Sequence, residues 1–151
     1  GIAESLDDNH QHARVGQVEY LGHKMMEYGI PIVKPIGGHG IFVDAKAFLP
    51  HLTQDQFPAQ TLAAEMYIDS GVRTMERGIV SAGRKSNGEN YYPKLELVRF
   101  TIPRRVYTQA HMDVIAESAA AVYARRNSIK GLKMIYEPKY LRFFQAKFEK
   151  L

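Results

Sequence analysis

Apolar residues return every three or four positions in three stretches of the chain, which is the spacing of one face of an α-helix. The first stretch covers residues 1–29 and is closed by Gly29, a residue type that commonly ends helices. The second covers 57–71, and the third covers 109–126, directly after Thr108, whose hydroxyl group suits a helix start. The pattern therefore predicts three helices that each bury one face.

A period of two residues marks the predicted strands. Along 95–102 the side chains alternate: Glu96, Val98, Phe100 and Ile102 point to one side, and Leu95, Leu97, Arg99 and Thr101 to the other. Further strands are predicted at 32–35, 40–45 and 132–138, the first two joined as a hairpin through a glycine turn. This order of elements predicts an α+β fold, in which helices pack on a small, mostly antiparallel sheet.

The composition fits one folded domain. The chain has 151 residues, of which 45% are hydrophobic, enough to form a core. No apolar run is long enough to span a bilayer and no basic-then-apolar leader is present, so we expect a protein that is neither membrane-spanning nor secreted. Cysteine is absent, which removes disulfides and thiol chemistry and is compatible with a cytoplasmic location.

Positive charge gathers near the C-terminal end of a chain whose formal net charge is +4 at pH 7. Two acidic residues there, Glu137 and Glu149, face a larger basic set: Arg125, Arg126, Lys130, Lys133, Lys139, Arg142, Lys147 and Lys150. Such a segment is compatible with nucleic-acid binding, with a solvated surface, or with a face packed against the rest of a larger protein. No nucleic-acid motif accompanies the charge, so we do not expect a nucleic-acid partner.

Most familiar catalytic patterns are missing from the sequence. The glycine-rich stretch 37–40 precedes a strand instead of opening a helix, so it is interpreted as a turn and not as a phosphate-binding loop. The six histidines show no paired spacing with carboxylates on one helix face, and no metal site is expected. The G-x-S-x-G elbow of serine hydrolases is absent as well.

The remaining candidates for chemistry are arginines. Arg99 stands in the middle of a predicted strand, and a buried guanidinium group needs a partner. That partner is either a carboxylate in a structural salt bridge or a bound anion, and the residues alone leave both open. Arg77 lies in the stretch MERG, where Glu76 could pair with it in a surface network. The neighbours Phe143 and Phe144 are expected to belong to the core.

Several long blocks of the sequence resemble the C-terminal portion of the β-eliminating lyases, the family of tyrosine phenol-lyases and tryptophanases. The blocks are GGHGIFVDAKAFLPHLTQDQFPAQTLAAEMYIDSGVR, MERGIVSAGR, PKLELVRFTIPRRVYT and IKGLKMIYEPKYLRFF, so the similarity runs essentially end to end. The resemblance implies the small domain of a fold-type-I pyridoxal phosphate enzyme with an aspartate-aminotransferase-like architecture. Such enzymes are homotetramers activated by potassium, and they cleave an aromatic amino acid to pyruvate, ammonia and the free ring.

Two positions separate the branches of this family. Arg77 and Phe143 match the tyrosine phenol-lyase branch, whereas tryptophanases carry an apolar residue and a histidine there. The resemblance implies that Arg99 binds the α-carboxylate of the substrate with both arms of its guanidinium group. It implies a catalytic role for Arg77, which would hydrogen-bond the phenolic oxygen. Phe143 would form a wall of the ring pocket, and Met75 would line the same pocket.

A complete family member is roughly three times as long as this chain, as a two-domain protein of that size would be. The resemblance therefore implies a linking helix at 1–29 and the C-terminal small domain at 30–151. The large domain, with the lysine and phosphate-binding residues that hold pyridoxal phosphate, would lie upstream, so no cofactor-binding residue is assigned here and the chain alone is expected to be inactive. The alternatives are a tryptophanase-type lyase domain and a non-catalytic interaction or folding fragment.

Overall fold

The computed structural model describes residues 1–103 and 105–151. Its α-helices are α1 (Asp8–Glu27), α2 (Ala45–Phe48), α3 (Pro58–Ser70), α4 (Ile79–Ala82), α5 (Gln109–Ala124) and α6 (Arg142–Gln145). Its strands are β1 (Gly40–Asp44), β2 (Met75–Arg77), β3 (Leu97–Thr101), β4 (Leu132–Tyr136) and β5 (Lys147–Lys150). Short 3-10 helices lie at Glu4–Leu6, Gln54–Gln56 and Arg126–Ser128.

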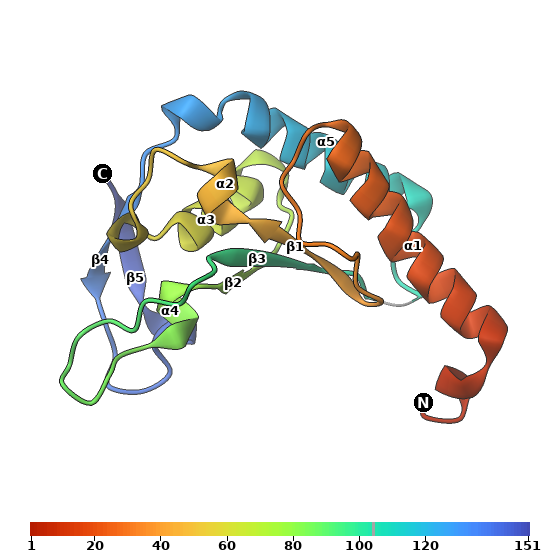
Figure 1. Ribbon diagram of the computed structural model, residues 1–151, viewed down its shortest axis with the longest axis horizontal. Coiled ribbons are helices and arrows are strands. Elements are labelled where there is room, and N and C mark those ends of the chain that lie inside the picture. Colours follow the sequence, from red (N-terminus) through yellow and green to blue (C-terminus); the bar gives the residue numbers. More distant parts are fainter. Residues whose placement is uncertain (104) are drawn as a thin grey trace.

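Two antiparallel sheets form the β structure. Strands β1, β3 and β2, in that order, make a three-stranded sheet, and β4 pairs with β5 in a separate hairpin. Figure 1 shows α1, α3 and α5 on one side of the three-stranded sheet, with the other side largely uncovered. The predicted α+β class, with helices on a small antiparallel sheet, is confirmed.

The alternation predicted for β3 is present. Val98 and Phe100 point toward the helices and are buried, as are Glu96 and Ile102 just outside the strand. The main core lies between this side of the sheet and the helices, which contribute residues such as Leu21 from α1. The opposite side, which we call the open face, carries the other set of side chains: Phe42 from β1, Met75 and Arg77 from β2, and Leu97, Arg99 and Thr101 from β3.

The three predicted helices are confirmed as α1, α3 and α5. The side chain of Asp7 caps α1, and Thr108 forms a capping box with the third residue of α5. Helix α3 has Pro58 at its start and is followed by Gly71, whose φ of 74° is the left-handed conformation that glycine tolerates best. In residues 1–103 and 105–151, no helix has the length and apolar character needed to cross a membrane.

Helix α1, at the start of the chain, is part of the main core. Its buried residues include Val18 and Met25, and Tyr20 donates a hydrogen bond of 2.6 Å to Asp113 of α5. The helix ends at Glu27, two residues before the end of the predicted segment 1–29. The division itself stays a prediction.

The predicted hairpin at 32–45 is only half correct. Strand β1 forms, but its ladder partner is β3, and the segment before it makes a single bridge between Ile32 and Val43. Pro31 and Pro35 flank this bridge and have no N–H group to donate, so the segment cannot extend a ladder. On its other edge β1 pairs with β3, a strand from far along the sequence.

A second, smaller core lies beneath the β4–β5 hairpin. Its buried residues, Phe57, Ile79 and Val80, come from the start of α3 and from α4. The rings of Phe57 and Phe148 meet edge to face at 5.3 Å, and Phe143 of α6 packs on the same cluster. This core thus fixes α6, the element that carries one of the candidate site residues.

Candidate functional site

The pairing of β2 with β3 brings three candidate residues onto the open face. Met75 stands opposite Arg99, and Arg77 stands opposite Leu97. Residues that face each other in an antiparallel pair share one side of the sheet, and diagonal neighbours are about 7–8 Å apart. The two arginines are such diagonal neighbours, so their side chains leave the same surface at a short separation.

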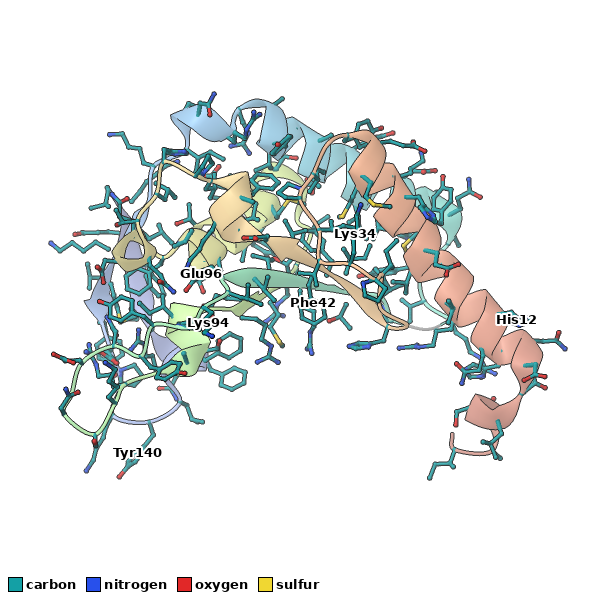
Figure 2. All side chains as sticks on the ribbon, in the orientation of Figure 1. His12, Lys34, Phe42, Lys94, Glu96 and Tyr140 are labelled. Atoms are coloured by element: carbon teal, nitrogen blue, oxygen red, sulfur yellow. The ribbon has the colours of Figure 1, made fainter. Side chains whose placement is uncertain are left out.

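Arg99 has a charge that the described chain does not neutralise. Its side chain is half-buried, and its Nη2 donates a hydrogen bond of 3.1 Å to the sulfur of Met75. The Nε atom is buried and has no hydrogen-bond partner, and no carboxylate in residues 1–103 and 105–151 forms an ion pair with this arginine. Phe42, its neighbour on β1, lies on the same face (Figure 2). A structural salt bridge within the described part of the chain is therefore not found, which favours an anion from outside it.

Arg77 is exposed at the edge of the sheet and lies against an aromatic ring. Its guanidinium carbon is 5.7 Å from the centre of the Phe143 ring, within the range of a cation–π contact. The described residues offer it no hydrogen-bond acceptor. The five donors of the guanidinium group are therefore available to a ligand that lies along the ring.

Phe143 contacts both the second core and the ring of Phe144. It packs on the second core, and its ring contacts Phe144 edge to face at 5.0 Å and 75°. Phe144 is 74% exposed, so the expectation that both belong to the core is wrong for Phe144. The reason is the short helix α6, on which adjacent residues point in different directions and only one can reach the core.

Arg142 ties α6 to the rest of the site, a role that the sequence did not indicate. It is 8% exposed, and it donates hydrogen bonds to Asn90 (2.8 Å), Glu137 (3.2 Å) and the carbonyl of Ile79 (3.4 Å). Burial lowers the pKa of this arginine, against the raising effect of the Glu137 charge. Glu137 also forms an ion pair with Arg84.

Behind Arg77 lies a pair of buried acids, Glu76 and Glu96. The alternative in which Glu76 pairs with Arg77 at the surface is not found, since strand alternation turns Glu76 to the helix-covered side. Glu96 had a visible signal in the sequence, because it is the one charged residue in the apolar set of its strand. Burial raises the pKa of both carboxyl groups.

The four candidate residues thus form two contacting pairs on one surface, Arg99 with Met75 and Arg77 with Phe143. The roles assigned to them stay predictions. In the part of the chain that the structure describes, no group of three or more histidine and acidic side chains is placed to hold a metal ion. What the surface offers is a pair of cations beside an aromatic wall, which suits an anionic ligand with a ring.

Comparison with known proteins identifies the family. The profile of the β-eliminating lyases matches residues 6–118. The tyrosine phenol-lyase of Nostoc punctiforme is 70% identical over 150 residues, which are 99% of this chain and 32% of that protein. The tyrosine phenol-lyases of Symbiobacterium thermophilum and Intrasporangium calvum are 63% and 62% identical over 99% and 100% of this chain.

The chain spans about a third of the length of these relatives. The matched profile and the sequence identities both point to the β-eliminating lyases. The resemblance noted from the sequence motifs is confirmed. The chain belongs to the β-eliminating lyase family.

Proposed function

We propose that this chain is the C-terminal part of a tyrosine phenol-lyase, an enzyme that converts L-tyrosine to phenol, pyruvate and ammonia. The observation that carries the proposal is the open face itself: Arg99 without a carboxylate partner, diagonal to Arg77, which lies against Phe143. The names of the relatives support it. They also favour it over a tryptophanase-type domain, as do the identities of Arg77 and Phe143.

Arg99 binds the α-carboxylate of the substrate in this proposal. Its guanidinium group forms no ion pair with a carboxylate of the described residues, and a carboxylate accepts two parallel hydrogen bonds from such a group. Met75 does not compete strongly, because a thioether sulfur is a weak acceptor. Fixing the carboxylate at two points orients the Cα–H bond for proton removal.

Arg77 and Phe143 act at the other end of the substrate. The phenol ring lies against Phe143, and Arg77 donates a hydrogen bond to the phenolic oxygen. This contact stabilises the keto form of the ring, in which the ring becomes a leaving group. A donor aimed at an atom where charge develops contributes most in a site that excludes water.

Pyridoxal phosphate does not fit the residues of this surface. The four candidate residues, which are two arginines, a methionine and a phenylalanine, include no lysine for covalent attachment, and their donors suit a substrate carboxylate and a phenol. We infer that residues outside this chain hold the cofactor, which supplies an electron sink when bound. The chain alone is then inactive.

Four further properties of the whole enzyme follow from the family resemblance and are part of the proposal. They are a homotetrameric assembly, activation by potassium, a cytoplasmic location and the division into a linking helix at 1–29 and a small domain at 30–151. The absence of cysteine in all 151 residues is compatible with a reducing compartment.

The test is Arg77→Ala in a full-length lyase that carries this segment. The kcat/KM for L-tyrosine should fall by about 10²- to 10³-fold, the usual effect of removing one such donor. Activity on a β-substituted amino acid whose leaving group has no phenolic hydroxyl group should persist. Arg73→Ala is the matched control, because Arg73 is exposed and precedes β2. Equal losses on both substrates would contradict the role of Arg77.

A further inference from the structure

The residue between Met75 and Arg77 belongs to a buried carboxyl pair. Glu76 is 2% exposed and Glu96 is fully buried, and both lie on the helix-covered side of the sheet. Glu96 directly precedes β3 (Figure 2). A Cβ atom placed on Gly78 would lie 2.0 Å from Oε2 of Glu96 and 2.8 Å from Oε1 of Glu76. The two carboxyl groups therefore meet around Gly78, which leaves the space between them free of any side chain.

The hydrogen bonds to the two acids are unequal. Both oxygens of Glu76 accept main-chain N–H groups, from Val80 at 3.1 Å and from Ser81 at 2.9 Å. In Glu96 only Oε1 is engaged, by the N–H of Ile79 at 2.9 Å and the side-chain amide of Gln54 at 2.9 Å. Oε2 of Glu96 is buried and has no partner. A proton on this atom would turn an unsatisfied acceptor into a donor beside Gly78, where Oε1 of Glu76 also approaches.

The basic side chains nearest the pair have other partners. Arg142, which reaches the carbonyl of Ile79 from α6, is already paired with Glu137. Lys46 of α2 is exposed and donates to the carbonyl of Lys94; its charge acts to lower the pKa of Glu96, but burial and the charge of Glu76 outweigh it. No cation among the described residues forms an ion pair with either acid of the pair. Oε2 of Glu96 and Oε1 of Glu76 both lie within 2.8 Å of one point, the Cβ position at Gly78, so two ionised carboxylates in this buried site would repel each other strongly.

Burial is the main cause that raises the pKa of each acid. For Glu76 it outweighs the hydrogen bonds from the first residues of α4, and for Glu96 the charge of Glu76 raises the pKa further. The unpartnered Oε2 identifies Glu96 as the residue that keeps the proton.

We propose that Glu76 and Glu96 form a carboxylic acid–carboxylate pair, in which Glu96 holds the proton on Oε2 and donates it to Glu76. The pair connects β2 to the start of α4 and to the chain before β3, because its acceptors engage the N–H groups of residues 79–81. Arg77 lies inside this connected segment, so the pair sets its position. Neither acid faces the substrate side; both are positioning residues. Only the kinetic consequence rests on the proposed function.

The proton itself is tested by infrared spectroscopy on the full-length lyase with ¹³C-labelled glutamate. The wild-type protein at neutral pH should show the band of a protonated carboxyl group, and Glu96→Gln should remove it. The amide of this variant retains an oxygen for Ile79 and Gln54 and a donor for Glu76. The proposal would be overturned if the wild type showed no protonated-carboxyl band, or if its band persisted in Glu96→Gln. This result does not depend on catalysis, so it stands apart from a failure of the proposed function.

The positioning role is tested by the pH dependence of kcat/KM. Removing the last proton at high pH leaves two charges in contact and displaces Arg77, so the wild type should lose activity on L-tyrosine more steeply than on a substrate without a phenolic hydroxyl group. Glu96→Gln should remove this difference and stay near wild type at neutral pH. Glu76→Gln should lose about tenfold or more on L-tyrosine, because its amide would face N–H donors. Identical pH profiles of the wild type and Glu96→Gln, or equal losses in the two glutamine variants, would refute the role.

Discussion

Arg99 donates a hydrogen bond of 3.1 Å to the sulfur of Met75, the residue directly opposite it on the edge strand β2. A thioether is a weak acceptor, and it carries no charge to neutralise the guanidinium group. The contact therefore orients Arg99 on the open face and leaves its charge for a ligand. A carboxylate side chain at position 75 would form an ion pair with Arg99, and the guanidinium group would then be less available to a ligand.

Arg99→Lys should weaken the use of every amino-acid substrate. Lysine keeps the positive charge but has no planar fork, so one of two charge-assisted hydrogen bonds to the substrate carboxylate is lost. We expect kcat/KM to fall by about 10- to 100-fold for L-tyrosine and by the same factor for substrates without a phenol. Steady-state kinetics on two substrates measure this. Arg73→Lys serves as the control, and an effect restricted to L-tyrosine would speak against the assignment.

Gly78→Ala should destabilise the turn between β2 and α4. The new methyl group would meet Oε2 and Cδ of Glu96 at 2.0 and 2.5 Å, and overpacking of this kind costs about 1–3 kcal/mol. The φ angle at Gly78 is −142°, outside the left-handed region, so the predicted loss is argued from the clash.

Hydrogen exchange of the amides in α4 within the full-length protein measures this local stability. Gly16→Ala is the matched control, because Gly16 lies inside α1 with nothing within 4 Å of an added Cβ. That change should leave stability unchanged or raise it by up to about 1 kcal/mol. Equal protection of α4 in wild type and Gly78→Ala would contradict the close approach of Glu96.

Arg142→Met should detach α6 from the site. The variant loses the hydrogen bonds to Asn90, Glu137 and the carbonyl of Ile79, and we expect a local loss of about 2–3 kcal/mol with lower kcat/KM for L-tyrosine. Arg84→Met removes the other partner of Glu137, but that side chain is 44% exposed, so its loss should stay within about 1 kcal/mol. Similar effects of the two variants would show that burial of Arg142 is unimportant.

Glu65 should make the junction of α3, α5 and β5 sensitive to acid. Burial acts to raise the pKa of Glu65, but hydrogen bonds from Arg125 and Lys150 outweigh it and hold that pKa below its ordinary value of 4.5. A lowered pKa means that the ionised form stabilises the fold. That contribution is complete above pH 4.5 and is lost as the pH falls through the lower, folded-state pKa.

Glu65→Gln should therefore weaken this junction at neutral pH by about 1 kcal/mol, a small value because both basic partners are partly in solvent. The difference from wild type should shrink as the pH falls below 4.5. Hydrogen exchange in the last turn of α5, corrected for the intrinsic pH dependence, measures this. Glu117→Gln, at an exposed position of α5, should show no such trend. A constant difference at all pH values would contradict the pairing.

The sequence was sufficient for the three long helices and for strands β1, β3 and β4. These elements show local patterns in the sequence: helical spacing around Leu21, Leu62 and Ile115, and alternation around Val98. An element that buries one face must carry its apolar residues at such a spacing, so the pattern predicts the element. The partner of β1 was not accessible in this way. The nearest strand-like segment is limited by Pro31 and Pro35, and the true partner lies more than fifty residues later, where only the packed core selects it.

For the site, residue types were more informative than positions. The sequence singled out Arg99 as an arginine in an apolar strand but left its partner open, because whether a carboxylate reaches it depends on tertiary contacts. Arg142 was missed since its burial depends on the fold of the β4–β5 hairpin around it. Glu96 stood out as an acid among apolar residues, yet its meeting with Glu76 depends on Gly78, which no periodic pattern reveals.

The strand order β1–β3–β2 has a consequence for how such an enzyme can diversify. Under the proposed function, Arg99 on the central strand contacts the part common to all amino acids, while Arg77 and Phe143 sit on an edge strand and a four-residue helix. A substitution at the periphery disturbs fewer neighbours than one in the middle of the sheet. Selection can therefore exchange the leaving group that the pocket accepts and keep the same scaffold, so two branches with different aromatic substrates can descend from one ancestor.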